Sequence, residues 1–73
     1  MKMTKEDLFE GQLVELTGEF NDRETGLEGT IRSLEVIDYE VVRVEIFWKS
    51  INKVDIFSIE EEPNILSKLK EIK

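Results

Sequence analysis

The sequence predicts a mainly β fold, a small barrel of about five short strands followed by a short C-terminal amphipathic helix. Apolar and polar residues alternate in several segments, and this period of two is typical of half-buried strands. Glycines and polar turns separate the segments. A flat sheet of so few strands would expose both edges to pairing with other chains, so we expect it to close into a barrel.

The 73 residues are enough for a single domain, which we expect to cover residues 1–73. The barrel takes about residues 8–62, and the helix takes about residues 63–72. Hydrophobic residues make up 40% of the chain, which is sufficient for a folded core although 37% of the residues are charged. Because the chain has no cysteine, no disulfide or thiolate zinc site supports this small core.

Four segments have the pattern of strands: residues 12–17, 30–36, 41–48 and 54–57. The third is the most regular, and every second residue forms its inward face: Val42, Val44, Ile46 and Trp48. In the second, the apolar phase changes between Ile31 and Leu34, which predicts a one-residue bulge near Arg32 and Ser33.

The connections carry fewer signals. Residues 37–40 lack the Asn-Gly or Asp-Gly pair of a two-residue hairpin turn, so a somewhat longer loop is expected there. Thr4 opens a short capped turn that presents Leu8 and Phe9 to the core. Phe20 is the one large apolar residue of the polar loop 19–26, and we expect it to fold back onto the core.

The last element begins at Pro63, whose fixed φ and missing N–H suit the first helical position. Apolar residues follow at helical spacing: Ile65, Leu66, Leu69 and Ile72. A helix of about ten residues is too short to be stable alone in water, so its apolar stripe is expected to dock on the barrel or on a partner.

Short motifs with glycine, valine and isoleucine recur in a fixed order at residues 9–16, 25–31, 42–46 and 54–61. This order resembles an SH3-like small barrel of the KOW and translation-protein type. Sm-like barrels, which begin with a helix and share the bent five-stranded plan, match it nearly as well. The resemblance implies an RNA- or ribosome-associated domain. KOW-type domains that bind RNA carry basic and aromatic residues in their loops, whereas the loop here is acidic, with Arg23 as its only base.

Charge is distributed unevenly along the chain, whose formal net charge is −7. Residues 6–48 hold twelve acids against three bases, a net charge of −9, while residues 49–73 hold five of each. Because nucleic acids are bound mainly through basic residues, this distribution disfavours direct nucleic-acid binding. No apolar run is long enough to cross a membrane and no secretory signal precedes the domain, so a cytoplasmic location is expected.

The sequence offers little for catalysis, and we expect no enzyme, no cofactor and no metal. Histidine is absent, so the serines have no activating base. Residues 21–32 place Arg23 and Arg32 where an EF-hand needs ligands, which leaves only an opportunistic cation site among loop carboxylates. Gly26 and Gly29 bracket a G-x-x-G, but between predicted strands they suit a turn and a close approach rather than a phosphate clamp.

The function that this composition favours is a non-catalytic protein-interaction module. Its candidate partner-binding residues are the loop acids and two aromatic residues: Glu19, Asp22, Glu24, Glu28, Tyr39 and Phe47. Phe47 and Trp48 are adjacent on one strand and point to opposite faces, so Phe47 is either exposed or covered by the C-terminal helix.

Other functions stay open beside the interaction module. Carboxylates two residues apart on a strand repeat at about 6.6 Å, close to the spacing of phosphates, so the chain could act as a nucleic-acid-mimicking inhibitor. The plainer alternative is an acidic surface that keeps a small protein soluble, with Arg32 and Arg43 paired across strands to Glu35 or Glu45. An RNA- or ribosome-associated domain remains the third function. A homodimer through residues 54–57 or through the helix stripe is open as well.

Overall fold

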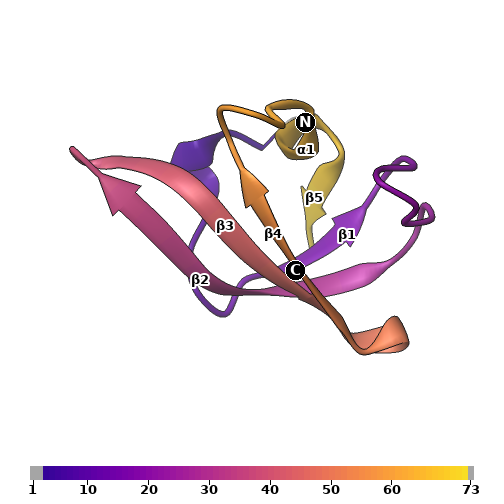
Figure 1. The fold of residues 1–73 in the computed structure, drawn as a ribbon. Helices are drawn as coiled ribbons and strands as arrows, with labels where there is room; N and C mark the ends of the chain where they lie inside the picture. The colour runs from indigo at the N-terminus through magenta and orange to yellow at the C-terminus, as the bar shows by residue number, and fades with distance from the viewer. Residues whose placement is uncertain (1–2, 73) are drawn as a thin grey trace.

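The computed structural model describes residues 3–72, so residues 1, 2 and 73 of the expected domain lie outside it. Its elements, in chain order, are the 3₁₀ turn η1 (Lys5–Asp7), β1 (Leu13–Leu16), β2 (Glu28–Ile37), β3 (Glu40–Trp48), the 3₁₀ turn η2 (Lys49–Ile51), β4 (Lys53–Ser58), α1 (Asn64–Ser67) and β5 (Leu69–Glu71) (Figure 1). The fold is mainly β with one short C-terminal helix, as the sequence predicts. No helix among residues 3–72 is long and apolar enough to span a membrane.

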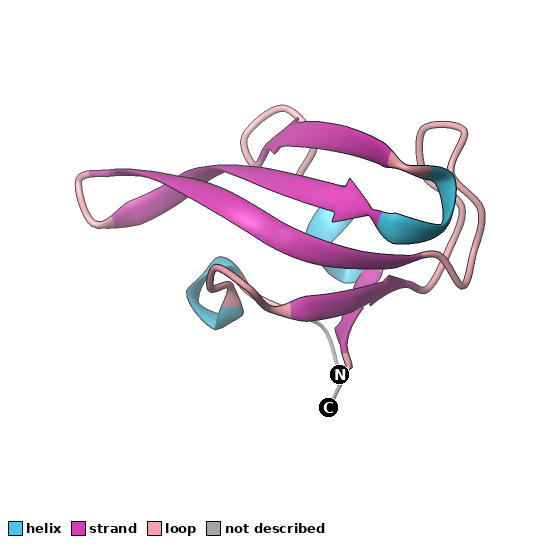
Figure 2. Ribbon diagram, turned by 90° about the horizontal axis from the view of Figure 1, so that it is seen from below, coloured by secondary structure: helices cyan, strands magenta, loops and turns pink. Residues whose placement is uncertain are grey.

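The five strands form one antiparallel sheet in the order β4-β3-β2-β1-β5. Strands adjacent in the chain pair with each other, except that β5 returns to the far side of β1. The β2–β3 hairpin is the longest part of the sheet and extends away from the rest of the molecule (Figure 2). The sheet twists and curls, which gives it a concave side (Figure 1).

The core fills this concave side with apolar side chains from every strand. Its buried members are Met3, Leu8, Val14, Leu16, Ile31, Val44, Ile46, Trp48, Phe57, Ile65 and Leu69. Trp48 is the largest of them and is fully buried, whereas Val42 of the predicted inward series is only half-buried. Gly29 makes room for Trp48, because a Cβ at Gly29 would lie 2.7 Å from Trp48 Cε3 and from Ile46 Cγ2.

Several local predictions are confirmed. The β2–β3 register shifts between Ile31 and Ser33, which is the bulge expected near Arg32. A second shift follows between Glu35 and Val36, where none was expected. Phe20 folds back onto the core and meets Phe57 edge to face, with ring centroids 5.6 Å apart.

The N-terminal turn is capped as expected, but only one of its two apolar residues reaches the core. The Asp7 carboxylate accepts hydrogen bonds from the backbone N–H and the hydroxyl of Thr4. Leu8 is buried, whereas Phe9 is 52% exposed, so the prediction for Phe9 is wrong. Adjacent side chains of an extended segment point to opposite sides, so the chain leaving η1 can bury only one of them.

The predicted longer loop at residues 37–40 is wrong as well. Ile37 pairs directly with Glu40, which leaves Asp38 and Tyr39 as a two-residue turn with φ of 53° and 67°. Positive φ at both central residues is the signature of a type I′ turn, whose twist matches the flanking strands. The pairing along β2 and β3 fixes this turn, although its sequence lacks the usual glycine.

The C-terminal helix is shorter than predicted. It ends at Ser67, and residues expected to extend it form β5, where Leu69 pairs with Leu16. The backbone N–H of Thr17 donates to the carbonyl of Lys68, and that of Ile72 donates to the carbonyl of Leu13. The free edge of β1 thus gains a partner, and these tertiary hydrogen bonds outweigh a weak local preference for helix.

Candidate functional site

The six predicted partner-binding residues do not form one surface. The loop between β1 and β2, which contains Glu19, Asp22 and Glu24, lies at the start of β2, whereas Tyr39 lies at the tip of the β2–β3 hairpin (Figure 1). These are opposite ends of the longest strand. The structure therefore divides the candidates into an acidic loop (residues 19–28), a hairpin tip (residues 36–39), and Phe47 on the strand face between them.

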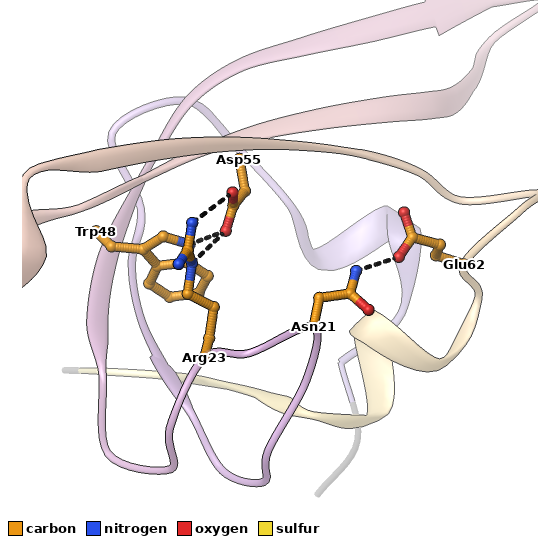
Figure 3. A network of polar contacts seen from close by, with 5 residues as sticks. All are labelled: Asn21, Arg23, Trp48, Asp55 and Glu62. Atoms are coloured by element: carbon orange, nitrogen blue, oxygen red, sulfur yellow. Dashed lines mark hydrogen bonds and ion pairs between the residues drawn. The ribbon is translucent and has the colours of Figure 1, made fainter.

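The acidic loop is held in place by its one basic residue. The Arg23 guanidinium donates from Nε to Asp55 Oδ2 at 2.9 Å and from Nη2 to Asp55 Oδ1 at 3.1 Å (Figure 3). The indole Nε1–H of Trp48 donates to Asp55 Oδ2 at 2.6 Å. Asp55 thus joins the loop, the centre of the core and β4 through three hydrogen bonds, two of them a bidentate ion pair.

The ionisation of this pair follows from its contacts. Burial would raise the pKa of Asp55, but the hydrogen bonds from Arg23 and Trp48 and the charge of Arg23 outweigh it and hold the pKa below its usual value. The hydrogen bond to Asp55 raises the pKa of Arg23, although its partial desolvation opposes this. The pair is therefore fully charged at neutral pH, which suits a structural ion pair rather than a proton-transfer group.

Two further contacts anchor the loop. Asn21 Nδ2 donates to a Glu62 carboxylate oxygen in the turn before α1 (Figure 3). Phe20 and Arg23 hydrogen-bond to each other through their backbones and close the loop into a narrow turn. The four predicted acids, Glu19, Asp22, Glu24 and Glu28, are all exposed around this frame. Asp22 and Glu24 also border a shallow hollow of about 380 Å³ shared with Lys53 and Ile51.

The hairpin tip is built differently, because its side chains make few contacts. Tyr39 is fully exposed, and Val36 and Ile37 beside it are 56% and 54% exposed. Within residues 3–72, every other residue with positive φ is Gly, Asn or Asp: Gly11, Asn21, Asp22, Gly26, Asp38 and Asn52. Tyr39 is thus a large aromatic residue at a strained backbone position that offers its ring no packing.

Phe47 is neither fully exposed nor covered by a C-terminal helix. It is half-buried on β3, with Thr30 and Val54 as its cross-strand neighbours. The Arg32 guanidinium carbon lies 5.8 Å from the centroid of its ring, a cation–π distance. This contact shields one side of Phe47, which makes it a weaker candidate for partner binding than Tyr39.

The charges of the outer sheet face are largely paired. Arg43 forms an ion pair with Glu35 at 3.1 Å, and Arg32 lies 3.8 Å from Glu45, as the sequence predicts. Lys5 of η1 reaches Glu40 at the base of the hairpin tip at 3.2 Å. Among residues 3–72 no group of three or more acidic side chains is arranged to hold a metal ion.

Four exposed apolar residues stand out in the structure; the sequence names residues 54–57 as a possible dimer surface but does not single out the two exposed residues at the hairpin tip. Val36 and Ile37 end β2 just before the turn that contains Tyr39, and Val54 and Ile56 lie on the edge strand β4. Their alternation identifies them as strand residues, but it does not show which face is buried until the register is known. The second bulge, between Glu35 and Val36, changes the phase of the hairpin tip and could not be read from the apolar pattern.

Comparisons with known proteins add no assignment to this geometry. No model of a protein family matches the chain. No curated protein and no solved structure matches it either.

Proposed function

We propose that this chain is a non-catalytic protein-interaction module of the SH3-like barrel type, and that it binds its partner through the hairpin tip. The observation that carries the proposal is Tyr39, a fully exposed aromatic side chain at φ 67°. Glycine or asparagine would relieve the strain at this position, and stability alone gives no reason for tyrosine. Exposed aromatic side chains are the commonest anchors of protein interfaces.

The surroundings of Tyr39 favour a particular kind of partner. Val36 and Ile37 are exposed on opposite faces of β2 beside the turn, so apolar surface adjoins the ring on both faces and the partner should offer an apolar pocket. Asp38 lies in the turn itself, so basic residues beside that pocket would complement this acidic rim. Tyr39 would fill the pocket, and the acidic rim would orient the two proteins.

The fold supports the SH3-like part of the proposal. Five antiparallel strands in the order β4-β3-β2-β1-β5, with a long β2 and a last strand that returns to β1, fit the plan that the sequence motifs resemble. Two alternatives from the sequence have less support. A nucleic-acid mimic needs free carboxylates on the sheet, but Glu35 and Glu45 pair with arginines. An RNA-binding domain needs basic residues in loops that are acidic here.

Photo-cross-linking from the hairpin tip tests the proposal directly. Replacing Tyr39 with the photoreactive residue p-benzoylphenylalanine keeps an aromatic ring at the tip, and irradiation in lysate of the source cells should join it to one dominant protein. The same residue at Leu13, which is 52% exposed on β1, is the matched control and should label that protein far less. Equal labelling from both positions, or none from either, would contradict the proposal.

A second variant separates binding from folding. Tyr39→Gly creates the Asp-Gly pair that a type I′ turn prefers, so the hairpin should form at least as well as in the parent chain. Its affinity for the cross-linked partner should nevertheless fall by at least about tenfold, because the anchor side chain is gone. Retained affinity would show that the tip is not the contact surface.

A further inference from the structure

We infer that a second copy of this chain pairs with β4, edge to edge and antiparallel, through Val54 and Ile56, to form a symmetric dimer with a continuous ten-stranded sheet. This goes beyond the proposed function, because it needs neither the hairpin tip nor a foreign partner. The inference starts from the backbone of β4, which pairs with β3 and, within residues 3–72, with no other strand.

The β3–β4 register shows which backbone groups are free. The N–H of Ile59 donates to the carbonyl of Val42, so hydrogen-bonded pairs alternate from there along the two strands. Phe57, Asp55 and Lys53 therefore direct their N–H and C=O groups toward β3. Val54 and Ile56 direct theirs away from the sheet, and no backbone hydrogen bond to another described residue satisfies them.

Only one antiparallel register pairs the two free residues of one copy with the two free residues of the other. If Val54 of one copy pairs with Ile56 of the other, four intermolecular N–H···O=C bonds form about a two-fold axis at Asp55. Moving the register by two residues would bring in Ser58, whose carbonyl already accepts the N–H of Glu62 at 2.8 Å. Asp55 would face its own copy across the axis, and its charge is already matched by Arg23.

The side chains of this edge suit burial. Val54 is 43% exposed and Ile56 is 60% exposed, and in the inferred register each would lie beside the other across the interface. Both are β-branched residues without a charge, a bulge or a proline to discourage pairing. The other edge of the sheet, β5, has only three residues and carries the exposed Lys70 on its outer face.

Charge favours a second copy over an unrelated strand. The acidic excess is confined to residues 6–48, whereas β4 belongs to the neutral final third, where two copies repel least. Exposed Lys49 and Lys53 stand at the start of β4, and exposed Glu60 and Glu61 follow its end. Antiparallel pairing places the basic end of each strand beside the acidic end of its partner. Because the two chains are identical, this favourable contact forms twice.

Oligomeric state tests the inference first. Sedimentation equilibrium over a concentration series should show a reversible monomer–dimer equilibrium. Ile56→Lys should raise the dimer dissociation constant by at least about tenfold, because an apolar side chain leaves the interface and two like charges enter it. Leu13→Lys, the same kind of change at a residue of similar exposure on a strand paired on both sides, should change the constant by less than about twofold. A monomer at every concentration, or equal effects of both variants, would overturn the inference.

Cysteine cross-linking tests the register, since the parent chain contains no cysteine that could interfere. A mixture of Val54→Cys and Ile56→Cys chains should form the mixed disulfide under mild oxidation faster than either chain links to itself, as mass spectrometry of the non-reduced product can measure. Preferential self-linking of the Ile56→Cys chain would mean a different register and would overturn the pairing inferred here. Circular dichroism of the reduced variants confirms that both are folded.

Discussion

The acidic loop and the hairpin tip are both turns with positive φ that connect to β2, but they are held in different ways. The loop is fixed by side chains: Arg23 is paired with Asp55, Asn21 contacts Glu62, and Phe20 packs on Phe57. The tip is fixed only by the backbone ladder of β2 and β3, and its own side chains point into solvent.

This difference separates residues that stabilise the fold from residues that stability does not explain. Each strained residue of the loop is an asparagine or aspartate, which tolerates the conformation, and the loop's one arginine is used internally. At the tip, the strained residue is a tyrosine without packing partners. Contacts within the fold therefore explain the residues of the loop. They do not explain Tyr39 at the tip, which is consistent with the proposed role in binding.

The strongest test of the loop's anchoring is Asp55→Ala. The change removes the acceptor of both Arg23 and the buried Trp48 indole N–H, and an unsatisfied buried donor costs about 1–3 kcal/mol. We expect the free energy of unfolding, measured by urea denaturation, to fall by about 2 kcal/mol. Glu62→Ala, which removes only the exposed contact to Asn21, is the control and should cost less than about 0.5 kcal/mol.

The same pair predicts a dependence on pH. Because the pKa of Asp55 is lower in the folded protein than in the unfolded chain, the folded state releases its proton more readily. The stability that Asp55 contributes is therefore fully present above the unfolded value, about pH 4, and is lost as pH falls through the lower folded value. The stability difference between the parent chain and Asp55→Asn should shrink between pH 7 and pH 3. A constant difference would mean that the carboxylate charge plays no part.

The tip should respond in the opposite direction. Tyr39→Gly relieves a left-handed conformation that costs a non-glycine residue about 1–2 kcal/mol, while glycine's greater freedom in the unfolded chain offsets part of this gain. We expect the free energy of unfolding to rise by about 1 kcal/mol, measured by urea denaturation at pH 7. Tyr39→Ala, which removes the ring but keeps the strain, is the control and should leave stability nearly unchanged. A loss of stability in Tyr39→Gly would reveal packing by the ring.

The sequence predictions are accurate where a local pattern determines the structure. Alternation along β3 predicts that Val44, Ile46 and Trp48 face the core, because a strand with one buried face must repeat every two residues. Gly29 is likewise readable as a close approach. Both depend on local pattern, and the structure confirms both.

The sequence predictions are wrong where contacts between distant segments determine the local structure. Leu69 fits a helix as well as a strand by its spacing, and only the unpaired edge of β1 selects the strand. Asp38 and Tyr39 adopt the tight turn because the arms of the hairpin pair up to it. The Arg23–Asp55 pair joins residues 32 positions apart, and no spacing rule predicts such a contact.

The smallest effect is expected from the acidic loop itself. A variant with Glu19→Gln, Asp22→Asn, Glu24→Gln and Glu28→Gln removes four exposed charges and leaves Arg23 and Asp55 in place. Stability should change by less than about 0.5 kcal/mol, because exposed charges contribute little. Affinity for the partner cross-linked from Tyr39 should change by less than about threefold at physiological salt, mainly through the association rate.

This last variant decides which end of β2 recognises the partner. Long-range attraction by the loop acids would speed association at low salt and disappear at high salt, whereas contact by Tyr39 would set the dissociation rate at any salt concentration. Surface plasmon resonance at two salt concentrations separates the two rates. If the fourfold variant dissociates faster than Tyr39→Gly, the acidic loop is the contact surface. The strained tyrosine would then require an explanation other than binding.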